Sequence, residues 1–166
     1  MQTVELFESA ISWLRENYRD FRFFTERDIV WTIQVHIIKL IKKHNLACRI
    51  FHNFPVLPGK TTDLAILRQD NSIEVAAEFK YEPSHSRKFT DVWPTKLPVV
   101  FYEDGVGKDV ERIHEFVSKG RARVAYLIFI DEGGYFRWRE PFSGSEWIDW
   151  QNGVSVLWAR VEKKLK

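Results

Sequence analysis

The segment that decides the fold runs from residue 61 to residue 81 and reads TTDLAILRQDNSIEVAAEFKY. Over 72–82 apolar and polar residues alternate, which is typical of a β-strand with one packed face and one polar face. A second strand-forming run covers 63–69, and Asp70-Asn71 between the runs favours a two-residue hairpin turn. We therefore predict two antiparallel strands in a register that sets Asp63 directly opposite Glu78.

This register concentrates charge on one small patch. Glu78 and Lys80 point to the same face, because side chains alternate along a strand. Like charges directly opposite each other, such as Asp63 and Glu78, destabilise a sheet, and Mg²⁺ prefers carboxylate oxygens. The hairpin therefore predicts a site for metal-assisted cleavage of phosphodiesters. The alternative is an ordinary sheet face that is open to solvent. On such a face an exposed ion pair stabilises the fold by only roughly a few tenths of a kcal/mol.

Length and composition limit the class of protein. The 166 residues, 45% of them hydrophobic, fit one folded domain. The net charge of +2 favours a polyanionic partner only weakly. The single cysteine, Cys48, excludes a disulfide framework and a Cys-based zinc cluster. Neither a signal peptide pattern nor an apolar run of about 20 residues is present, so we expect a soluble cytoplasmic protein without a membrane partner.

Hydrophobic periodicity predicts the other elements. A nearly continuous apolar run at 124–130 is typical of a strand covered on both faces. A helix preceding that strand indicates a crossover within a mixed sheet, so we expect an α/β sandwich with helices on both sheet faces. Residues 83–107 are expected to be mostly loop. The predictions are helices at 3–18, 26–44 and 108–119, strands at 49–56, 99–102, 135–139 and 154–162, and a helical turn at 145–151.

This order of elements, with its charged residues, resembles the PD-(D/E)XK nuclease superfamily. The core of that family is a helix bearing a glutamate, a three-stranded meander bearing an aspartate and then E-x-K, a helix and a further strand. The resemblance covers about residues 20–131 and implies a restriction-endonuclease-like mixed β-sheet sandwiched by helices. It implies that these residues form the core of a single domain and that 132–166 form a C-terminal β extension. The matching residues are Glu26, Asp63, Glu78 and Lys80, and the one departure is Thr62, where the named motif has proline.

The resemblance implies a metal-dependent endonuclease or exonuclease that hydrolyses phosphodiester bonds, with DNA as the expected substrate. It implies Mg²⁺, with Mn²⁺ as an alternative, bound by Asp63, Glu78 and the backbone carbonyl of Phe79. Lys80 would hold or help to deprotonate the attacking water, or stabilise charge on the phosphorus centre. Glu26 would ligate the metal through water or help to bind a second ion. The implied catalytic set is therefore Glu26, Asp63, Glu78 and Lys80.

Basic residues near these positions are candidates for phosphate contacts. The candidate substrate-binding residues are Lys60, His85, Arg87 and Lys88. The predicted helix at 108–119 adds Lys108, Asp109 and Arg112 near its start, and the sequence does not single out one of them.

Other interpretations remain open at this point. The chain can be a non-catalytic nucleic-acid-binding or assembly module of the same fold, or an unrelated α/β domain with incidental charges. Specificity would have to come from the 83–107 loop, the C-terminal β region, a homodimer or a partner protein. Glu26 can instead complement the dipole of its helix, with Asp28 and Thr25 forming a capping box. Core or dimer packing is favoured over base stacking for Trp138, Trp147, Trp150 and Trp158.

Overall fold

The computed structural model describes residues 2–89 and 98–163. Its helices are α1 (Thr3–Asn17), α2 (Glu26–His44) and α3 (Val106–Ser118), with short 3-10 turns η1 (Tyr18–Asp20) and η2 (His85–Phe89). Its strands are β1 (Cys48–Leu57), β2 (Lys60–Arg68), β3 (Ile73–Glu82), β4 (Ala122–Asp131), β5 (Ser145–Asp149) and β6 (Ser155–Glu162).

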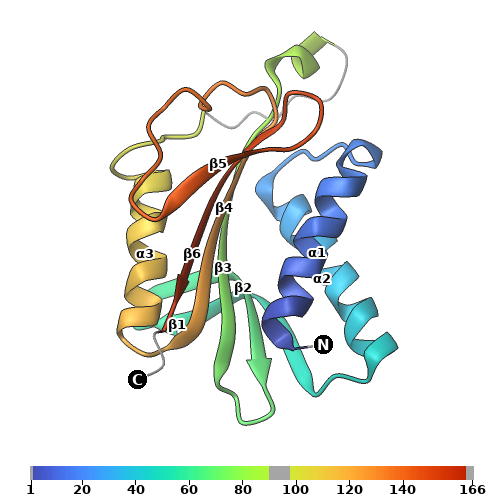
Figure 1. Ribbon diagram of the computed structural model, residues 1–166, viewed down its shortest axis with the longest axis vertical. Coiled ribbons are helices and arrows are strands. Elements are labelled where there is room, and N and C mark those ends of the chain that lie inside the picture. The colour runs from blue at the N-terminus through green and yellow to red at the C-terminus, as the bar shows by residue number, and fades with distance from the viewer. Residues whose placement is uncertain (1, 90–97, 164–166) are drawn as a thin grey trace.

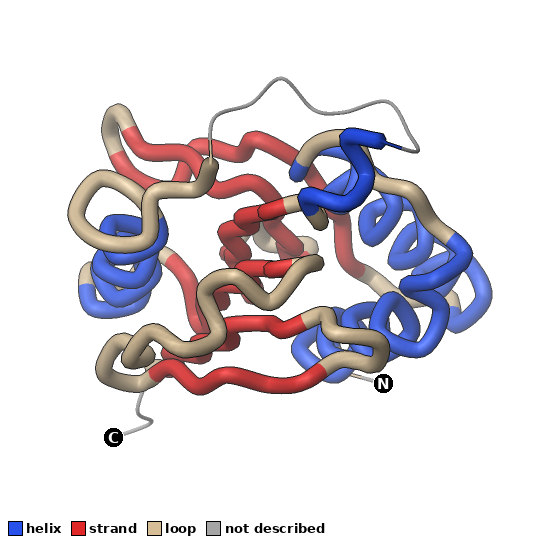
Figure 2. The backbone as a smooth tube through the Cα atoms, turned by 90° about the horizontal axis from the view of Figure 1, so that it is seen from above, coloured by secondary structure: helices blue, strands red, loops and turns tan. Residues whose placement is uncertain are grey.

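The six strands form one mixed sheet in the order β1-β2-β3-β4-β6-β5. β3 and β4 are parallel, and every other neighbouring pair is antiparallel. α1 and α2 cover one face of the sheet and α3 covers the other (Figure 1 and Figure 2). The predicted α/β class, the meander, the parallel crossover and the helices on both faces are confirmed.

The core is divided between the two faces of the sheet. β4 supplies both halves: Tyr126 and Ile128 pack towards α1 and α2, whereas Leu127 and Phe129 pack towards α3. All four side chains are fully buried, which confirms the prediction of a strand covered on both faces. The four tryptophans of the C-terminal third differ in how deeply they are buried. Trp150 is buried and Trp147 and Trp158 pack against the core, but Trp138 is 83% exposed.

The ends of α2 follow from local chemistry. Thr25 is its N-cap, and the Asp28 carboxylate accepts hydrogen bonds from the N–H groups of Phe24 (2.9 Å) and Thr25 (2.7 Å). The helix ends at Asn45, which adopts the left-handed conformation. This cap fixes Glu26 in the first turn of α2, at the end of the helix that approaches β3.

The β2–β3 hairpin turns through three residues instead of the predicted two. Asn71 donates its N–H to the Arg68 carbonyl (3.1 Å), Arg68 donates to the Ser72 carbonyl (3.0 Å), and Asn71 has a φ of 67°. This is a type I turn closed by a left-handed residue. The two-residue prediction is wrong because the Asp70 carboxylate accepts a hydrogen bond from the Ser72 N–H (2.9 Å), which stabilises the wider loop.

A bulge in β3 compensates for the extra turn residue. The pairing shifts by one residue at Glu74, which has no partner of its own in β2. Beyond the bulge, Leu64 lies opposite Ala77, as the predicted register requires. The next residues along the two strands are Asp63 and Glu78.

The polar face of β3 is covered rather than open to solvent. Glu74, Glu78 and Glu82 are each less than 5% exposed. α3 covers this face and buries its own apolar stripe against the sheet. The interpretation of Asp63 and Glu78 as charges on an ordinary solvent-facing sheet is therefore excluded for Glu78.

Four shorter predictions are also wrong. Residues 99–102 contain no strand, and α3 begins at Val106 rather than at 108. Residues 135–139 form turns instead of a strand, because the Asp131 carboxylate captures the Phe136 N–H (2.6 Å). Residues 145–149 form strand β5 instead of a helical turn, because they pair with β6. Part of the predicted loop, 90–97, lies outside the described residues.

No helix in the described part of the chain is long and apolar enough to cross a membrane.

Candidate active site

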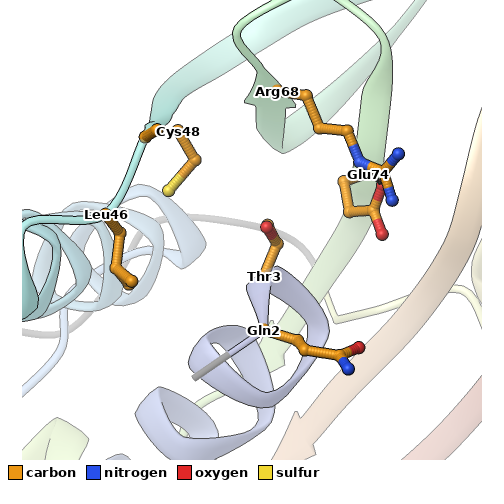
Figure 3. A pocket seen from close by; sticks show the side chains of 7 residues that line it. Gln2, Thr3, Leu46, Cys48, Arg68 and Glu74 are labelled. Carbon is orange, nitrogen blue, oxygen red and sulfur yellow. Dashed lines mark ion pairs between the residues drawn. The ribbon is translucent and has the colours of Figure 1, made fainter.

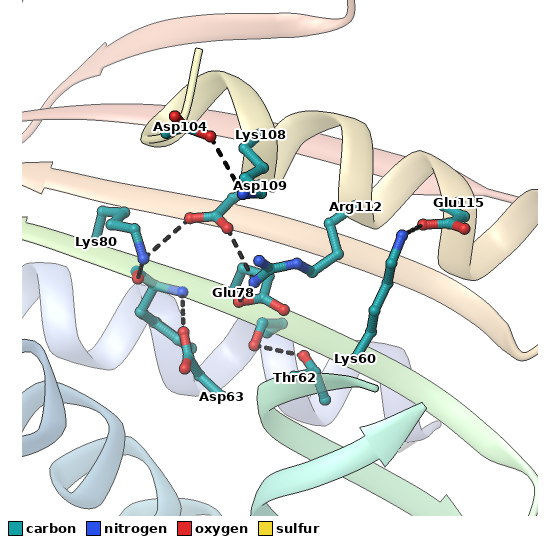
Figure 4. Close-up of polar contacts among 12 residues, drawn as sticks. Lys60, Thr62, Asp63, Glu78, Lys80, Asp104, Lys108, Asp109, Arg112 and Glu115 are labelled. Carbon is teal, nitrogen blue, oxygen red and sulfur yellow. Dashed lines mark hydrogen bonds and ion pairs between the residues drawn. The ribbon is translucent and has the colours of Figure 1, made fainter. Parts of the chain in front are cut away.

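The candidate site lies where β2 separates from β3. Their pairing ends at Leu64 and Ala77, whereas β3 pairs with β4 as far as Glu82. Towards the end of β3, side chains of β2 rather than its backbone form hydrogen bonds to the backbone of β3. The Asp63 carboxylate accepts a hydrogen bond from the Phe79 N–H (2.7 Å), as Figure 4 shows. The Thr62 hydroxyl, at the position of the motif's proline, donates to the Ala77 carbonyl (2.9 Å).

The backbone carbonyl of Phe79 faces the same side as Asp63. The N–H and the C=O of one strand residue point in the same direction, and the N–H of Phe79 is bonded to Asp63. The Lys80 ammonium donates to the Phe79 carbonyl at 3.4 Å. The carbonyl that the resemblance implies as a metal ligand is therefore turned towards the first implied carboxylate ligand.

Glu78 is 2% exposed, and among residues 2–89 and 98–163 Arg112 is its one ion-pair partner. Its Oε2 lies 3.3 Å from Nη1 of Arg112, and its Oε1 is buried without a hydrogen-bond partner among the described residues. Burial, with the carboxylates of Asp63 and Asp109, raises the pKa of Glu78 to about 9, although Arg112 and Lys80 lower it. At neutral pH this carboxyl group is therefore protonated unless a further cation approaches it.

Lys80 joins three elements through its ammonium group. Its Nζ lies 3.0 Å from Oδ2 of Asp109 on α3 and 3.8 Å from Oε2 of Glu26 on α2. Burial lowers the pKa of Lys80, but Asp109 and Glu26 outweigh that effect and the net pKa lies above its usual value. Lys80 is therefore a charged hydrogen-bond donor at neutral pH.

Asp63 experiences the same accumulation of negative charge. Burial raises its pKa, the hydrogen bond from Phe79 opposes that rise, and the nearby carboxylate of Glu26 adds to it. The net pKa of Asp63 lies above its usual value. Burial is the main cause of the raised pKa of both strand carboxyls, and a cation bound between them would lower each pKa.

The sequence analysis did not single out Asp109 and Arg112 of α3, yet both belong to the site. Asp109 is 3% exposed, and its Oδ1 lies 3.0 Å from Nη1 of Arg112, one helical turn away (Figure 4). The sequence contains a pattern that predicts the burial of Asp109. The helix period places Asp109 on the same face as the apolar Val106 and Ile113, which is the face that packs against the sheet.

The donor atoms suit a hard divalent cation. Among residues 2–89 and 98–163, no group of three or more His, Cys, Asp and Glu side chains is arranged to hold a metal ion. The implied ligand set needs only two such side chains, Asp63 and Glu78, with the Phe79 carbonyl as the third donor. All three donors are oxygens, as Mg²⁺ prefers, and the unpartnered Oε1 of Glu78 fits a missing cation. Glu26 is paired with Lys80, which suits contact with a metal through water.

Lys60 lies beside this site. It forms an ion pair with Glu115 of α3 (Figure 4). Together with Lys108 and Arg112 it lines a cleft of about 450 Å³ between the β1–β2 turn and α3. Because Arg112 also contacts Glu78, the cleft adjoins the carboxylate cluster, and its three cations can contact phosphates.

The other predicted substrate residues gather elsewhere, on η2. Arg87 is 8% exposed and donates to the Phe23 carbonyl (2.6 Å) and the Tyr81 hydroxyl (2.7 Å). His85 contacts Glu82 (2.9 Å) and its ring stacks on Tyr135. The Lys88 ammonium lies over the Phe89 ring. Arg87 therefore has a buried position, which distinguishes it from the exposed Lys88.

A further hollow of about 410 Å³ lies beside the N-terminus of α1, where β1 begins (Figure 3). Cys48 and the ion pair of Arg68 with Glu74 are among the residues that line it. None of the predicted site residues lines this hollow, so it contributes nothing to the carboxylate cluster.

No protein-family model, curated protein or solved structure matches this chain.

Proposed function

We propose that this chain is a metal-dependent nuclease with a restriction-endonuclease-like core, which hydrolyses phosphodiester bonds with DNA as its expected substrate. The observation that carries the proposal is the convergence of Glu26, Asp63, Glu78 and Lys80 at the point where β2 leaves β3. Burying several carboxylates together is costly unless a cation compensates them. A bound Mg²⁺ or Mn²⁺ ion would supply that compensation.

Asp63, Glu78 and the Phe79 carbonyl would hold the ion. When bound there, it polarises a phosphoryl oxygen and lowers the pKa of a bound water molecule. Its positive charge also favours the ionised form of Glu78, whose pKa is otherwise about 9. Glu78 would therefore hold the ion as a carboxylate.

Lys80 would act on the water or on the phosphate as a fixed cation. Its ammonium is held between Asp109 and Glu26, and its raised pKa keeps it charged. A charged donor orients the attacking water and stabilises the negative charge that develops on the phosphoryl oxygens. This role fits the geometry better than proton abstraction, which needs a neutral amine.

Arg112 supports contact with the substrate. Its guanidinium contacts Glu78 and also lines the cleft that contains Lys60 and Lys108. Arginine binds phosphate through paired N–H donors. Because Arg112 lines the cleft as well as contacting Glu78, its guanidinium can contact a phosphate of a substrate that lies in the cleft.

One observation favours the non-catalytic alternative. Lys80 and Arg112 already lie between the carboxylates and partly neutralise them in the absence of a metal. In that alternative, the cluster is a structural ion-pair network, and the cleft binds nucleic acid without cutting it.

Cleavage assays separate the two. The purified protein is incubated with supercoiled plasmid, linear duplex, single-stranded DNA and RNA, in Mg²⁺, in Mn²⁺ and in EDTA. We expect metal-dependent cleavage, and a decrease of at least about a hundredfold in Asp63→Asn and Lys80→Ala, because both groups act on the transition state. Glu16→Gln and Lys39→Ala, at exposed positions of α1 and α2, are the matched controls. Binding in EDTA with no cleavage in either metal would establish the non-catalytic alternative.

A further inference from the structure

A second polar pocket, of about 320 Å³, lies where β3 ends, on the face of the sheet that α1 and α2 cover. Its lining brings together four segments that are distant in the sequence: η1 with the residues after it, the start of η2 with Ser84 before it, the residue that follows β4, and the β5–β6 turn. The residues that matter for its chemistry are Arg19, Arg22, Ser84, Ser86, Arg87 and Glu132. None of the four predicted catalytic residues lines it.

The wall of this pocket is rigid because Arg87 is anchored. Its guanidinium Nη1 lies 2.6 Å from the Phe23 carbonyl oxygen, 2.7 Å from the Tyr81 hydroxyl and 3.2 Å from Oε2 of Glu132. Tyr81 also donates to the Phe23 carbonyl (3.2 Å). A buried charge held by several partners keeps one orientation, so the pocket retains its shape without a ligand.

The lining is rich in hydrogen-bond donors and positive in charge. It contains three arginines and one glutamate. Arg19 and Arg22 are exposed at its rim, where Arg19 bonds to the side-chain oxygen of Asn152. The hydroxyls of Ser84 and Ser86 lie 2.9 Å apart. Guanidinium and hydroxyl donors arriving from several directions match the tetrahedral oxygens of a phosphate group.

The pocket and the candidate active site are connected by short covalent segments. Lys80 and Tyr81 are neighbours on β3, and their side chains point to opposite faces. Ser84 follows Lys80 by four residues, so their Cα atoms are at most about 14 Å apart. Arg22 likewise precedes Glu26 by four residues. A nucleic-acid strand at Lys80 can therefore reach the pocket within a few nucleotides.

We propose that this pocket binds a phosphate group of the nucleic-acid strand that the active site cuts, a few nucleotides from the scissile bond. The identity of the strand rests on the proposed function, whereas the affinity of the pocket for phosphate does not. The group bound is either a terminal phosphate or one within the backbone, and both offer the same oxygens to Arg19 and Arg22.

The test measures binding in EDTA, which prevents cleavage. The probes are inorganic phosphate, a mononucleotide, and a fluorescent single-stranded oligonucleotide prepared with a 5′-phosphate, with a 3′-phosphate and with neither. Arg19→Ala and Arg22→Ala change the pocket, and Arg121→Ala removes an equal charge at an exposed position after α3. We expect the affinity for the oligonucleotide and for inorganic phosphate to fall about tenfold or more in the pocket variants only. A preference for one terminal phosphate would identify the end that is bound.

Other outcomes overturn the proposal. If inorganic phosphate or the mononucleotide depends on Arg19 and Arg22 but the oligonucleotide does not, the ligand is a small phosphate compound rather than a nucleic-acid strand. If the pocket variants and Arg121→Ala lower the affinities equally, or if the wild-type protein binds none of the probes, the pocket is not a phosphate site. None of these binding measurements requires cleavage. Each result can therefore be interpreted even if the protein shows no nuclease activity.

Discussion

At the scale of single residues, the ionisation of Glu78 depends strongly on folding. Burial and two neighbouring carboxylates raise its pKa from 4.5 to about 9. The folded protein therefore holds a proton between these pH values that the unfolded chain releases. The stabilisation from this proton is complete below about pH 4.5 and is lost as the pH rises through about 9.

Comparison with Glu78→Gln isolates this effect. The glutamine cannot ionise, so we expect its stability relative to wild type to be nearly constant below about pH 4.5. Between pH 4.5 and 9 the free energy of unfolding of wild type falls, so that of the variant should rise relative to wild type by an amount on the order of a few kcal/mol. Urea unfolding in EDTA across this pH range measures the difference. A difference that does not change with pH would contradict the raised pKa.

At the scale of elements, the β2–β3 hairpin determines whether Asp63 reaches Phe79. The turn has one residue more than the sequence analysis predicted, and the bulge at Glu74 restores the register. A slip by one residue would exchange the two faces of a strand and would move Asp63 away from Glu78. The turn and the bulge are thus both required for the site.

The left-handed residue of the turn offers a direct test. Asn71 has a φ of 67°, which glycine adopts freely and β-branched residues adopt only with strain. We expect Asn71→Gly to change the free energy of unfolding by less than about 0.5 kcal/mol and Asn71→Val to lower it by about 1 kcal/mol or more. Gln69→Val, in the same turn, is the control. Equal costs for the two valine variants would contradict the three-residue turn.

Elements defined by local signals were predicted well. The bounds of α1 and α2 follow from periodicity, the Thr25–Asp28 capping box and the left-handed Asn45. The errors fall where a distant partner decides. Asp131 captures the Phe136 N–H and prevents a strand at 135–139, and β5 forms because β6 is available to pair with it.

At the scale of the whole molecule, the candidate site joins both layers of helices to the sheet. Lys80 on β3 contacts Glu26 on α2 and Asp109 on α3. Asp109 also contacts Arg112, which in turn contacts Glu78. The arrangement of α3 over the sheet therefore controls the position of both cations.

Replacing Asp109 tests this control. In Asp109→Asn the ion pairs to Lys80 and Arg112 are lost, and we expect the rate constant for cleavage to fall about tenfold to a hundredfold. The affinity for Mg²⁺, measured by calorimetry, should change much less, because Asp109 is not one of the proposed ligands. Asp104→Asn, exposed just before α3, is the control. If both variants cleave equally well, Asp109 does not position Lys80 for catalysis.

The sequence by itself determined the local features: the helices, the alternation of β3, the hairpin register and the residue types at 26, 63, 78 and 80. These features depend on contacts between residues close in the chain or on a single turn. Only the tertiary structure decided that α3 buries Glu78, that Asp109 and Arg112 join the cluster, and that Arg87 lines a separate pocket. The physical reason is that burial and charge proximity, which set each pKa and each ion pair, arise only when distant segments pack together.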